Sequence, residues 1–539
     1  MCIRALVGGS PVPACLSASL VAVLCPSPGA AAQAEDTARP WQRWEHSLSS
    51  QAQYANPYAD VVLRVTYTGP DGAVIRTYGF WDGGSTFRIR CAFPQPGTWH
   101  WETECSNPGD PGLHGQSGEV RVLRSRRTDN PLWRHGFVRV SEDRRCLCHA
   151  DGTPFLWVGD TAWAGPMRST DEEWEEYLGD RATKHFTVIQ VGPASSWAGE
   201  ADRAGNRPFL GEGIGQWNPA FWQAYERKLQ RANERGFAVL MVGLMEPTER
   251  YPSSQQACLF ARNIVARLFG NCVAFSPSFD SGFMELGNDV GRAVRDATQV
   301  HLITQHPGTP SGHATNDIIE GYFDEPYLDF AGDQTGHNGG DRERCAHQAM
   351  EWNLHLYRRE PHKPVINLEA MYDVGGERGA FVGDDARSLG WRSWLSGAMG
   401  YTYGTDLYGW DTDEASPAFW RTQMRQESSQ QMTTLHDFLA ELRWWQLEPH
   451  HERVLNQPAE AVRQAPLAMT PDARVIVVYL PDEAPRELDL RNLPVRSWKT
   501  TWLDPRGGET QPGPRLSAEG PQTVTPPGAG DWVLLARGG

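Results

Sequence analysis

The stretch Lys363-Pro364-Val365-Ile366-Asn367-Leu368-Glu369-Ala370-Met371-Tyr372 is an apolar, β-type run that delivers a carboxylate, Glu369, near its end. An earlier run, Asn271-Cys272-Val273-Ala274-Phe275-Ser276-Pro277-Ser278-Phe279-Asp280, delivers Asp280 in the same way. Between Asp151 and Asp406 such runs alternate with amphipathic helical segments, a pattern typical of a parallel barrel. In that fold the C-terminal ends of the strands form the active site, so the sequence predicts that both carboxylates face one site.

Eight strand–helix units fit into this part of the chain. We expect strands over residues 155–160, 186–191, 237–244, 272–280, 301–306, 328–332, 363–369 and 400–405. We expect helices over 171–185, 219–236, 254–269, 283–298, 343–359 and 386–398, and a loop over 308–326. A doubly wound open sheet is the rival fold, but the Gly-rich phosphate loop of that fold is missing after the strand at 155–160. The barrel is therefore favoured.

β-rich segments flank the predicted barrel on both sides. Residues 40–124 alternate polar and apolar side chains around turns at 69–72 and 94–97, which predicts an N-terminal β-sandwich. After a helical linker over 426–452, strands at 474–480, 497–502 and 532–535 predict a C-terminal β-sandwich over 453–539. The predicted fold class is therefore α/β, with a (β/α)8 TIM barrel over 132–425 between two β-sandwiches.

Composition and charge narrow the classes of function. The chain has 539 residues, too many for one core, and a net charge of −16, which argues against nucleic acid as a partner. Residues 1–34 resemble an export signal, with Arg4, an apolar stretch over 14–24 and a small-residue cleavage site at 32–34. We therefore expect a secreted or periplasmic protein. Beyond this leader the sequence shows no apolar run long enough to span a membrane.

Seven cysteines follow the predicted signal, an odd number at irregular spacing, which favours buried thiols over a disulfide framework. Cys91 and Cys105 flank a turn, so one bridge between them stays open. Cys146-Leu147-Cys148-His149 has no second ligand pair at zinc spacing. We expect neither a metal nor another cofactor.

Polar and aromatic side chains follow all eight predicted strands. In chain order they are Asp160, Trp163, Gln190, Trp197, Glu246, Asp280, His306, Gln334, His337, Glu369, Tyr372, Tyr403 and Asp406. Two carboxylates from two strand ends suggest glycoside hydrolysis, in which one carboxylate attacks the sugar and the other carboxyl group protonates the leaving oxygen. The 22 Trp and 15 Tyr fit this interpretation, because aromatic faces in open clefts stack on sugar rings.

Several of these segments together resemble the apiosidase-like glycoside hydrolases. They are residues 157–163, 188–191, 302–307, 334–337, 363–372 and 397–404, and the resemblance covers nearly the whole chain after residue 34. It implies an N-terminal sandwich, a barrel and a C-terminal module of the type labelled collagen-binding. It also implies a retaining, exo-acting enzyme on a plant or microbial glycan, with apiose as one candidate sugar. The implied nucleophile is Glu369 and the implied acid/base is Asp280, while the other strand-end residues would bind the substrate.

Alternatives remain open at the sequence level. The segment 276–281 lacks the Gly-rich approach to the acid that the family predicts, so Glu285 and Glu246 remain candidates for the acid/base. A non-catalytic carbohydrate-binding or scaffold protein is a second class. A metal-dependent barrel hydrolase is a third, although paired His on one strand or a His–Glu–His helix would be expected there, and His301, His306, His313 and His337 are scattered.

Overall fold

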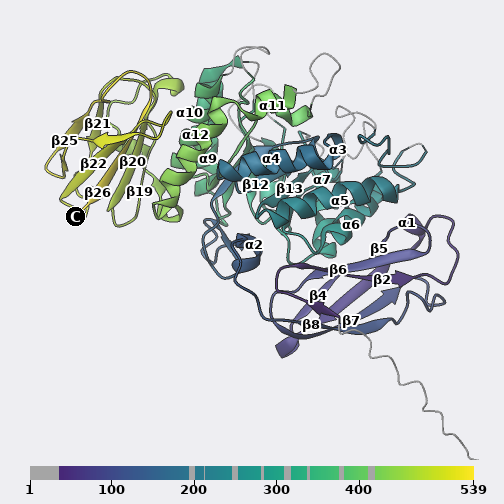
Figure 1. Cartoon of the computed structure of the whole chain (residues 1–539). Coiled ribbons are helices and arrows are strands. Elements are labelled where there is room, and N and C mark those ends of the chain that lie inside the picture. The colour runs from purple at the N-terminus through teal and green to yellow at the C-terminus, as the bar shows by residue number, and fades with distance from the viewer. Residues whose placement is uncertain are drawn as a thin grey trace, which may run out of the picture. The chain divides into compact units, whose positions relative to one another are not determined.

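The computed structural model describes residues 36–193, 201–211, 213–245, 253–280, 284–308, 317–336, 340–374, 382–410 and 419–539. The predicted export signal at 1–34 lies outside these residues. Residues 37–539 form one compact unit, drawn in Figure 1. In the described ranges, every helix is too short or too polar to cross a membrane.

The central element is a sheet of seven parallel strands in the order β14–β13–β12–β11–β17–β16–β15. The strands are β11 Trp157–Thr161, β12 Val188–Val191, β13 Ala238–Val242, β14 Val273–Ser276, β15 Ala331–Gln334, β16 Val365–Glu369 and β17 Gly400–Tyr403. Every residue of these strands is buried. Because both faces of these strands are buried, the strands appear in the sequence as short apolar runs rather than alternating ones.

The predicted strand at 301–306 is reduced to a single bridge between Ile303 and Phe275. On the β14 side, the Phe275 amide donates to Leu302 O at 2.9 Å. On the other side, just before β15, the Asp329 amide donates to Ile303 O at 2.9 Å. Residues 302–304 therefore lie between the chain segments that carry the two edge strands of the sheet.

Helices follow the strands; α4 contacts α5, and α5 contacts β13. The helices of this region are α3 Gly165–Arg168, α4 Asp171–Thr183, α5 Pro219–Glu234, α6 Ser254–Leu268, α7 Met284–Ala297, α8 Asp317–Phe323, α9 Arg342–Arg358, α10 Gly383–Leu395, α11 Phe419–Met424 and α12 Glu427–Ala440, with the 3-10 turn η4 Asp406–Gly409. Capping side chains set several starts: Thr170 and Glu173 form a capping box on α4, and Asn218 caps α5.

The loop expected over 308–326 contains a helix, α8, so this prediction is wrong in its second half. Ile319 and Phe323 of α8 are fully buried and form a small apolar cluster with Leu356 and Val365. Packing of these two side chains stabilises a helix that is too short to show a clear period in the sequence.

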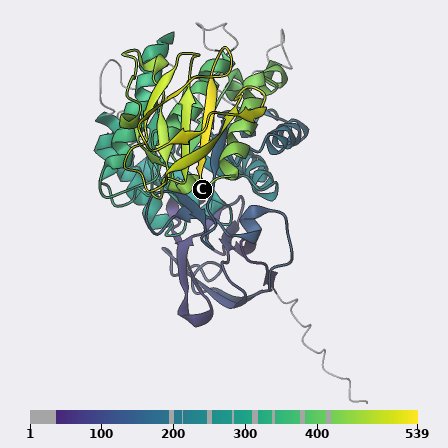
Figure 2. The ribbon, with the colours of Figure 1, turned by 90° about the vertical axis from the view of Figure 1, so that its left-hand side faces the viewer.

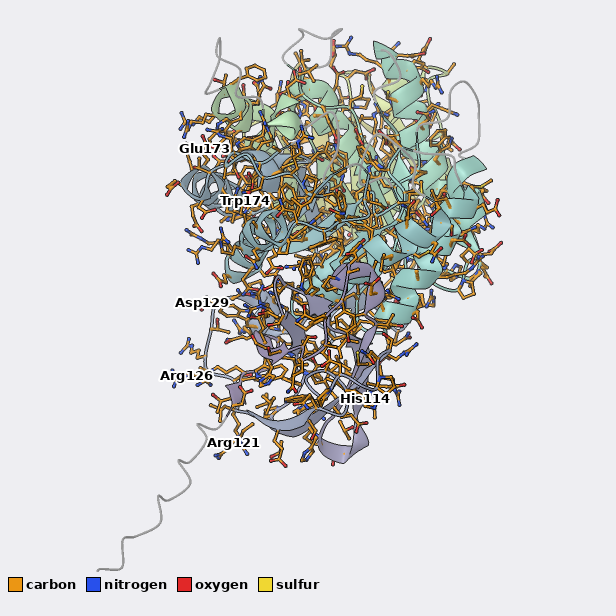
Figure 3. The ribbon with its side chains drawn as sticks, turned by 90° about the vertical axis from the view of Figure 1, so that its right-hand side faces the viewer. His114, Arg121, Arg126, Asp129, Glu173 and Trp174 are labelled. Atoms are coloured by element: carbon orange, nitrogen blue, oxygen red, sulfur yellow. The ribbon has the colours of Figure 1, made fainter. Side chains whose placement is uncertain are left out.

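The N-terminal region consists of two small sheets, ordered β1–β8–β7–β3–β4 and β2–β6–β5. Its elements are β1 Thr37–Ala38, β2 Arg43–Ser49, α1 Pro57–Asp60, β3 Leu63–Thr68, η1 Pro70–Gly72, β4 Val74–Tyr78, β5 Phe80–Trp81, β6 Thr86–Ala92, β7 Gly97–Cys105 and β8 Ser117–Val122. The polar segment after β8 carries Arg126 and Asp129, which are exposed (Figure 3). It leads through α2 Pro131–Arg134 and the hairpin β9 Val138–Val140 and β10 Leu147–His149 to the central sheet.

The C-terminal region is a seven-stranded antiparallel sheet with an additional strand pair (Figure 2). Its elements are η5 Trp444–Gln446, β18 Glu448–Pro449, η6 His451–Arg453, η7 Ala461–Arg463, β19 Leu467–Met469, β20 Val475–Leu480, β21 Arg486–Asp489, β22 Ser497–Leu503, β23 Thr510–Pro512, β24 Leu516–Ser517, β25 Pro521–Val524 and β26 Trp532–Gly538. The three predicted strands correspond to β20, β22 and β26, which are neighbours in the sheet.

Buried ion pairs join both flanking regions to helices around the central sheet. Arg90 of β6 binds both carboxylate oxygens of Glu226 on α5, at 2.9 and 2.7 Å. Arg387 of α10 binds both oxygens of Asp531, next to β26, at 2.9 and 2.8 Å. Burial raises the pKa of Glu226, but the charges of Arg267 and Arg90 outweigh it and hold that pKa at about 2. Such pairs fix orientation strongly, because losing one partner leaves a buried charge.

The seven cysteines after the predicted signal are all free thiols, Cys91 and Cys105 among them, and six of the seven are buried. The prediction of buried thiols is therefore confirmed for these six, and the bridge left open by the sequence is not formed.

Candidate active site

Four successive positions around the sheet bring side chains to one rim. Glu369 and Gln334 are the last residues of β16 and β15, His306 follows the bridge at Ile303, and Asp280 lies four residues beyond the end of β14. Because the strands are parallel, their C-terminal ends meet on the same side of the sheet. The rim therefore collects the two carboxylates that the sequence singled out.

His306 lies between these carboxylates. Its Nδ1 is 3.4 Å from Asp280 Oδ1, and its Nε2 is 3.2 Å from Glu369 Oε2. One oxygen of each carboxylate and one ring nitrogen all lie within 4.8 Å of one another. The imidazole is fully buried, the Glu369 side chain is 6% exposed, and that of Asp280 is 47% exposed.

The electrostatic balance favours a charged His306. Burial alone would lower the pKa of its ring, but hydrogen bonds to Asp280 and Glu369 and their negative charges raise it to about 9. The ring is therefore an imidazolium at neutral pH, and it screens the two carboxylates from each other.

Glu369 is held in a second direction by Tyr372. Burial and the charge of Glu369 raise the pKa of the Tyr372 hydroxyl well above its usual range, and a hydrogen bond to Glu369 adds to this. Trp163 Nε1 donates to the same hydroxyl oxygen at 3.2 Å. One residue earlier, Leu368 O accepts a 3.0 Å hydrogen bond from Gln190 Nε2 on β12. Tyr372 and His306 thus orient the Glu369 carboxylate, and Gln190 holds strand β16 in place.

Asp280 adopts a backbone conformation that few residues tolerate. Its φ is +50°, in the left-handed region where Asp and Asn are enriched among non-glycine residues. Gln334 Nε2 donates to Asp280 Oδ1 at 2.9 Å, the same oxygen that faces His306. Strained conformations of this kind persist where the surroundings fix them, and they cluster at functional sites.

The segment before Asp280 is locked to the segment around His306. The His306 amide donates to Ser276 Oγ at 2.8 Å, and Ser278 Oγ donates to His306 O at 3.1 Å. The Ser278 amide donates to Gln305 Oε1 at 2.9 Å. The fold thus fixes the backbone on which Asp280 sits.

Gly308 provides the space for that backbone. A Cβ at residue 308 would lie 2.7 Å from Asp280 O and 2.9 Å from its carbonyl carbon. Sequence reasoning missed this residue, because the close approach joins two segments that follow different strands. It also missed Phe279, whose ring packs against Trp163 at 4.9 Å and His306 at 5.6 Å, although Phe279 directly precedes the predicted acid.

Replacing Gly308 with Ala is expected to lower kcat by about 10- to 100-fold, because a shift of about 1 Å in a catalytic group has an effect of that size. The φ of Gly308 lies outside the left-handed range, so crowding of Asp280 alone causes the loss. Gly179→Ala is the matched control, since nothing lies within 4 Å of its added Cβ. Steady-state kinetics with an aryl glycoside, together with Tm, check the prediction. Unchanged kcat in a folded Gly308→Ala variant would refute it.

Other predicted binding residues lie in different surroundings. Asp160 is 1% exposed, and its Oδ2 accepts 2.6 Å hydrogen bonds from Tyr177 and Arg181 of α4. Tyr403 shares a 2.6 Å hydrogen bond with Ser428 of α12. Both side chains therefore connect the sheet to the outer helices, and these contacts indicate a structural role. Asp406 is buried at the start of η4.

Three predicted residues, Trp197, Glu246 and His337, lie outside the described residues. Glu285, the alternative acid, is an exposed residue in the first turn of α7.

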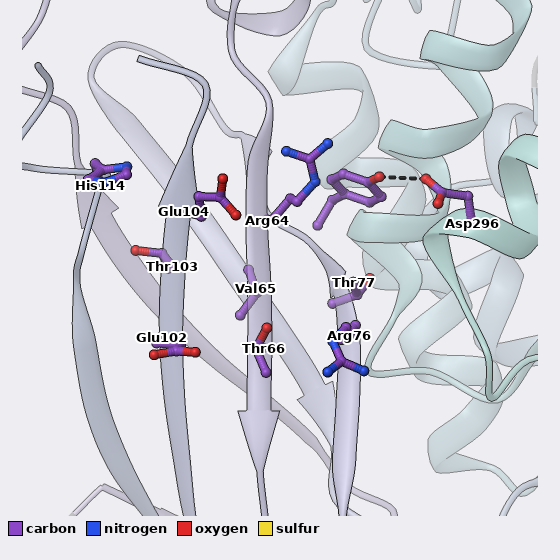
Figure 4. Close-up of a pocket in the computed structure, with 11 residues that line it drawn as sticks. Arg64, Val65, Thr66, Arg76, Thr77, Glu102, Thr103, Glu104, His114 and Asp296 are labelled. Carbon is purple, nitrogen blue, oxygen red and sulfur yellow. Dashed lines mark hydrogen bonds between the residues drawn. The ribbon is translucent and has the colours of Figure 1, made fainter. Parts of the chain in front are cut away.

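A separate hollow of about 450 Å³ lies on the N-terminal sheet (Figure 4). Its lining includes Arg64, Arg76, Glu102, Glu104 and His114 from strands β3, β4 and β7 and the loop before β8. The one aromatic side chain, Tyr78, is 8% exposed and donates its hydroxyl to Asp296 at 2.5 Å. The hollow thus lacks an open aromatic face for a sugar, and the carboxylate pair at the rim remains the candidate active site.

Comparison with known proteins finds similar folds among solved structures. A crystal structure described as a "putative glycoside hydrolase" from Bacteroides vulgatus aligns over 94% of this chain and all of its own, with a TM-score of 0.71 and 18% identity. A glycoside hydrolase family 5 structure from Bacteroides vulgatus aligns over 76% of this chain and 95% of its own, with a TM-score of 0.67 and 20% identity. At these identities the likeness concerns the fold, which is that of glycoside hydrolases with a TIM-like barrel. A comparison with curated protein sequences finds no match.

Family models cover three consecutive parts of the chain. The "Apiosidase-like, catalytic domain" model matches residues 141–446, more than half of the sequence, so the chain belongs to the apiosidase-like family. Residues 37–106 match a domain of unknown function, and residues 449–537 match a model described as "Putative collagen-binding domain of a collagenase". The family resemblance expected from the sequence is confirmed. Together with the fold, it supports a glycosidase.

Proposed function

We propose that this protein is a retaining, exo-acting glycoside hydrolase of a plant or microbial glycan, with Glu369 as the nucleophile and Asp280 as the acid/base. The observation that carries the proposal is the pair of carboxylates at the rim, with oxygens within 4.8 Å of each other and of the intervening His306. The proposal includes a closed (β/α)8 barrel, in which residues 302–304 act as the remaining strand.

The separation of the carboxylates supports double displacement. Retaining enzymes hold the two groups about 5–5.5 Å apart, whereas inverting enzymes hold them about 6.5–9.5 Å apart to admit a water molecule. One oxygen of Asp280 and one of Glu369 lie within 4.8 Å of each other, a separation closer to the retaining range than to the inverting one.

The first chemical step forms a bond between a Glu369 oxygen and the anomeric carbon. The bond from that carbon to the leaving oxygen breaks, and the leaving oxygen takes the proton of the Asp280 carboxyl group. In the second step Asp280 removes a proton from water, the water oxygen attacks the anomeric carbon, and Glu369 departs as a carboxylate. Two inversions give net retention, and Asp280 ends protonated as it began.

The neighbouring groups suit these roles. His306 and Tyr372 both contact Glu369, so its negative charge is stabilised and its oxygens are oriented for attack. His306 and Gln334 both face Oδ1 of Asp280, which leaves Oδ2 to carry the proton toward the leaving oxygen.

The difference in exposure supports exo action. Glu369 is nearly buried and Asp280 is half exposed, so a terminal sugar on Glu369 would lie deep while its leaving group points to solvent. Identifying the sugar calls for a panel of aryl glycosides that includes furanosides, with apiose as one member. Release of single sugars from an oligosaccharide substrate would support exo action, and internal cuts would contradict it. Export of the chain is a further part of this proposal.

Retention of anomeric configuration is the expected result of the decisive experiment. Proton NMR of the first minutes of hydrolysis should show the anomer of the substrate before mutarotation mixes the products. Non-enzymatic hydrolysis of the same glycoside serves as the control. If the inverted anomer appears first, the double displacement is wrong, and Asp280 and Glu369 would have to act around a water molecule.

The rival metal-dependent hydrolase gains one argument from the structure, because Asp280, His306 and Glu369 each offer a ligand atom within 4.8 Å. The raised pKa of His306 weakens this alternative, because an ion would have to displace a proton from the ring before it could bind. We therefore expect exhaustive EDTA treatment to leave kcat unchanged. Loss of activity with EDTA that a divalent ion restores would favour the metal-dependent mechanism.

A further inference from the structure

A second group of metal-ligating side chains lies away from the candidate active site. His185 follows α4, while His436 and Asp437 are in the last turns of α12. Asp437 Oδ1 is 2.6 Å from His185 Nδ1 and 2.9 Å from His436 Nδ1. The two rings lie 5.2 Å apart between centroids, and one ligand atom from each of the three residues lies within 4.8 Å of the others.

Hydrogen bonds hold the backbone next to these side chains in place. His185 has a φ of +59°, a left-handed conformation that non-glycine residues seldom adopt. The preceding Lys184 is fixed to α12, because its carbonyl accepts a 3.0 Å hydrogen bond from Thr433 and its Nζ donates to Ser429 at 2.8 Å. The α4–β12 connection and α12 therefore present the three residues to each other in the folded chain.

We propose that His185, His436 and Asp437 bind a divalent transition-metal ion of the zinc type. Two imidazole nitrogens and one carboxylate oxygen suit Zn²⁺, Co²⁺, Ni²⁺ or Cu²⁺, whereas Mg²⁺ and Ca²⁺ prefer oxygen ligands alone. Bonds of about 2.0–2.1 Å in a tetrahedron place ligand atoms roughly 3.3 Å apart, so the two observed N–O distances need to widen by less than about 1 Å.

Solvent can reach this group of ligands. The side chains of His185 and Asp437 are 48% and 53% exposed, and that of His436 is 20% exposed. An ion can therefore enter without unfolding the chain, and water can occupy a fourth ligand position.

The location indicates a stabilising ion rather than a catalytic one. His185 precedes β12 by three residues, whereas Gln190, near the other end of β12, braces the strand of Glu369. The ligand group therefore lies at the N-terminal end of the parallel strands, the face that supports stability rather than catalysis in such barrels. An ion there would join residues 252 positions apart in sequence, linking an early helix of the barrel region to its last one. An ion that binds the folded chain but not the unfolded chain would raise the stability of the folded state.

The test uses the full chain stripped with chelator. Calorimetric titration with Zn²⁺ should show one saturable ion per chain, Co²⁺ should give visible absorption bands of a low-symmetry site, and Tm should rise with metal concentration. His436→Ala and Asp437→Asn should each weaken binding by at least about 100-fold, since loss of a direct ligand exceeds the effect of losing an outer-shell partner. Each variant's Tm without metal shows whether it folds, and His185→Asn provides a third variant if one does not.

Two control variants separate this site from other sources of binding. His355→Ala removes an exposed imidazole that pairs with Glu320, and it should bind the ion as the unaltered chain does. Glu369→Gln alters the cluster at the rim, and it should also bind normally. The proposal is overturned if the unaltered chain shows no saturable binding, if His436→Ala and Asp437→Asn bind as tightly as the unaltered chain, or if Glu369→Gln abolishes the binding.

Discussion

Glu369→Ala is expected to reduce turnover on the order of 10⁴- to 10⁶-fold, the range seen when an enzyme loses its nucleophile. The loss follows because alanine has no oxygen to form the covalent intermediate, and Asp280 contacts the opposite nitrogen of His306 and is assigned to proton transfer. The isosteric Glu369→Gln variant also lacks the nucleophile, and its folding should be little affected because Gln fills the same space beside His306 and Tyr372. Steady-state rates and Tm on the same preparations measure both effects.

Azide distinguishes a lost nucleophile from general damage. In Glu369→Ala the vacated space admits azide, which should attack the anomeric carbon directly and restore turnover of substrates with good leaving groups. A single inversion then gives a glycosyl azide of opposite configuration to the substrate. Glu285→Ala is the matched control, because Glu285 is an exposed carboxylate on α7 and should show near-normal rates without azide. Near-normal activity in Glu369→Ala would remove Glu369 from the mechanism.

The core of the fold could be predicted because parallel strands are buried on both faces. Such strands appear as short apolar runs, and the runs that end near Glu369 and Asp280 are of this kind. The bridge at Ile303 was predicted as a full strand, since sequence alone cannot show that the backbone there pairs at only one position.

The direction of side chains at the strand ends was harder to predict. Successive residues of a strand face opposite sides, so a shift of one position moves a polar group from the barrel's rim to its outer helices. Asp160 and Tyr403 stand at strand ends yet contact α4 and α12, whereas Glu369 contacts His306. A run of apolar residues without alternation does not indicate which side chains point to the active-site rim and which point to the outer helices.

Contacts between different strands were beyond local reasoning. The position of His306 between two carboxylates depends on the order β14, 302–304, β15, β16 around the sheet. The close approach of Gly308 to Asp280 depends on the same order. Each of these residues is ordinary in its own segment, and its importance comes from a neighbour in another segment.

Asp280→Ala is expected to slow hydrolysis of natural glycosides by about 10²- to 10⁴-fold, the usual contribution of a positioned general acid. Substrates whose leaving group is already a weak base should lose far less in their first step, because departure of that group needs little protonation. For these substrates the second step becomes limiting, since water then lacks its base and the glycosyl-enzyme accumulates as a burst. Azide needs no base, so it should relieve this step and yield a glycosyl azide with the configuration of the substrate.

The choice of variant matters because Asp280 has a φ of +50°. Alanine is less tolerant of that conformation than asparagine, so part of a loss in Asp280→Ala could come from a moved backbone. Asp280→Asn keeps the left-handed preference and an oxygen that accepts from Gln334, but it cannot deliver a proton at neutral pH. Both variants should therefore show the same dependence on the leaving group. Equal losses on natural and activated substrates would show that Asp280 is not the acid. The same leaving-group comparison on Glu285→Ala and Glu246→Ala would then identify which of these two carboxyl groups donates the proton.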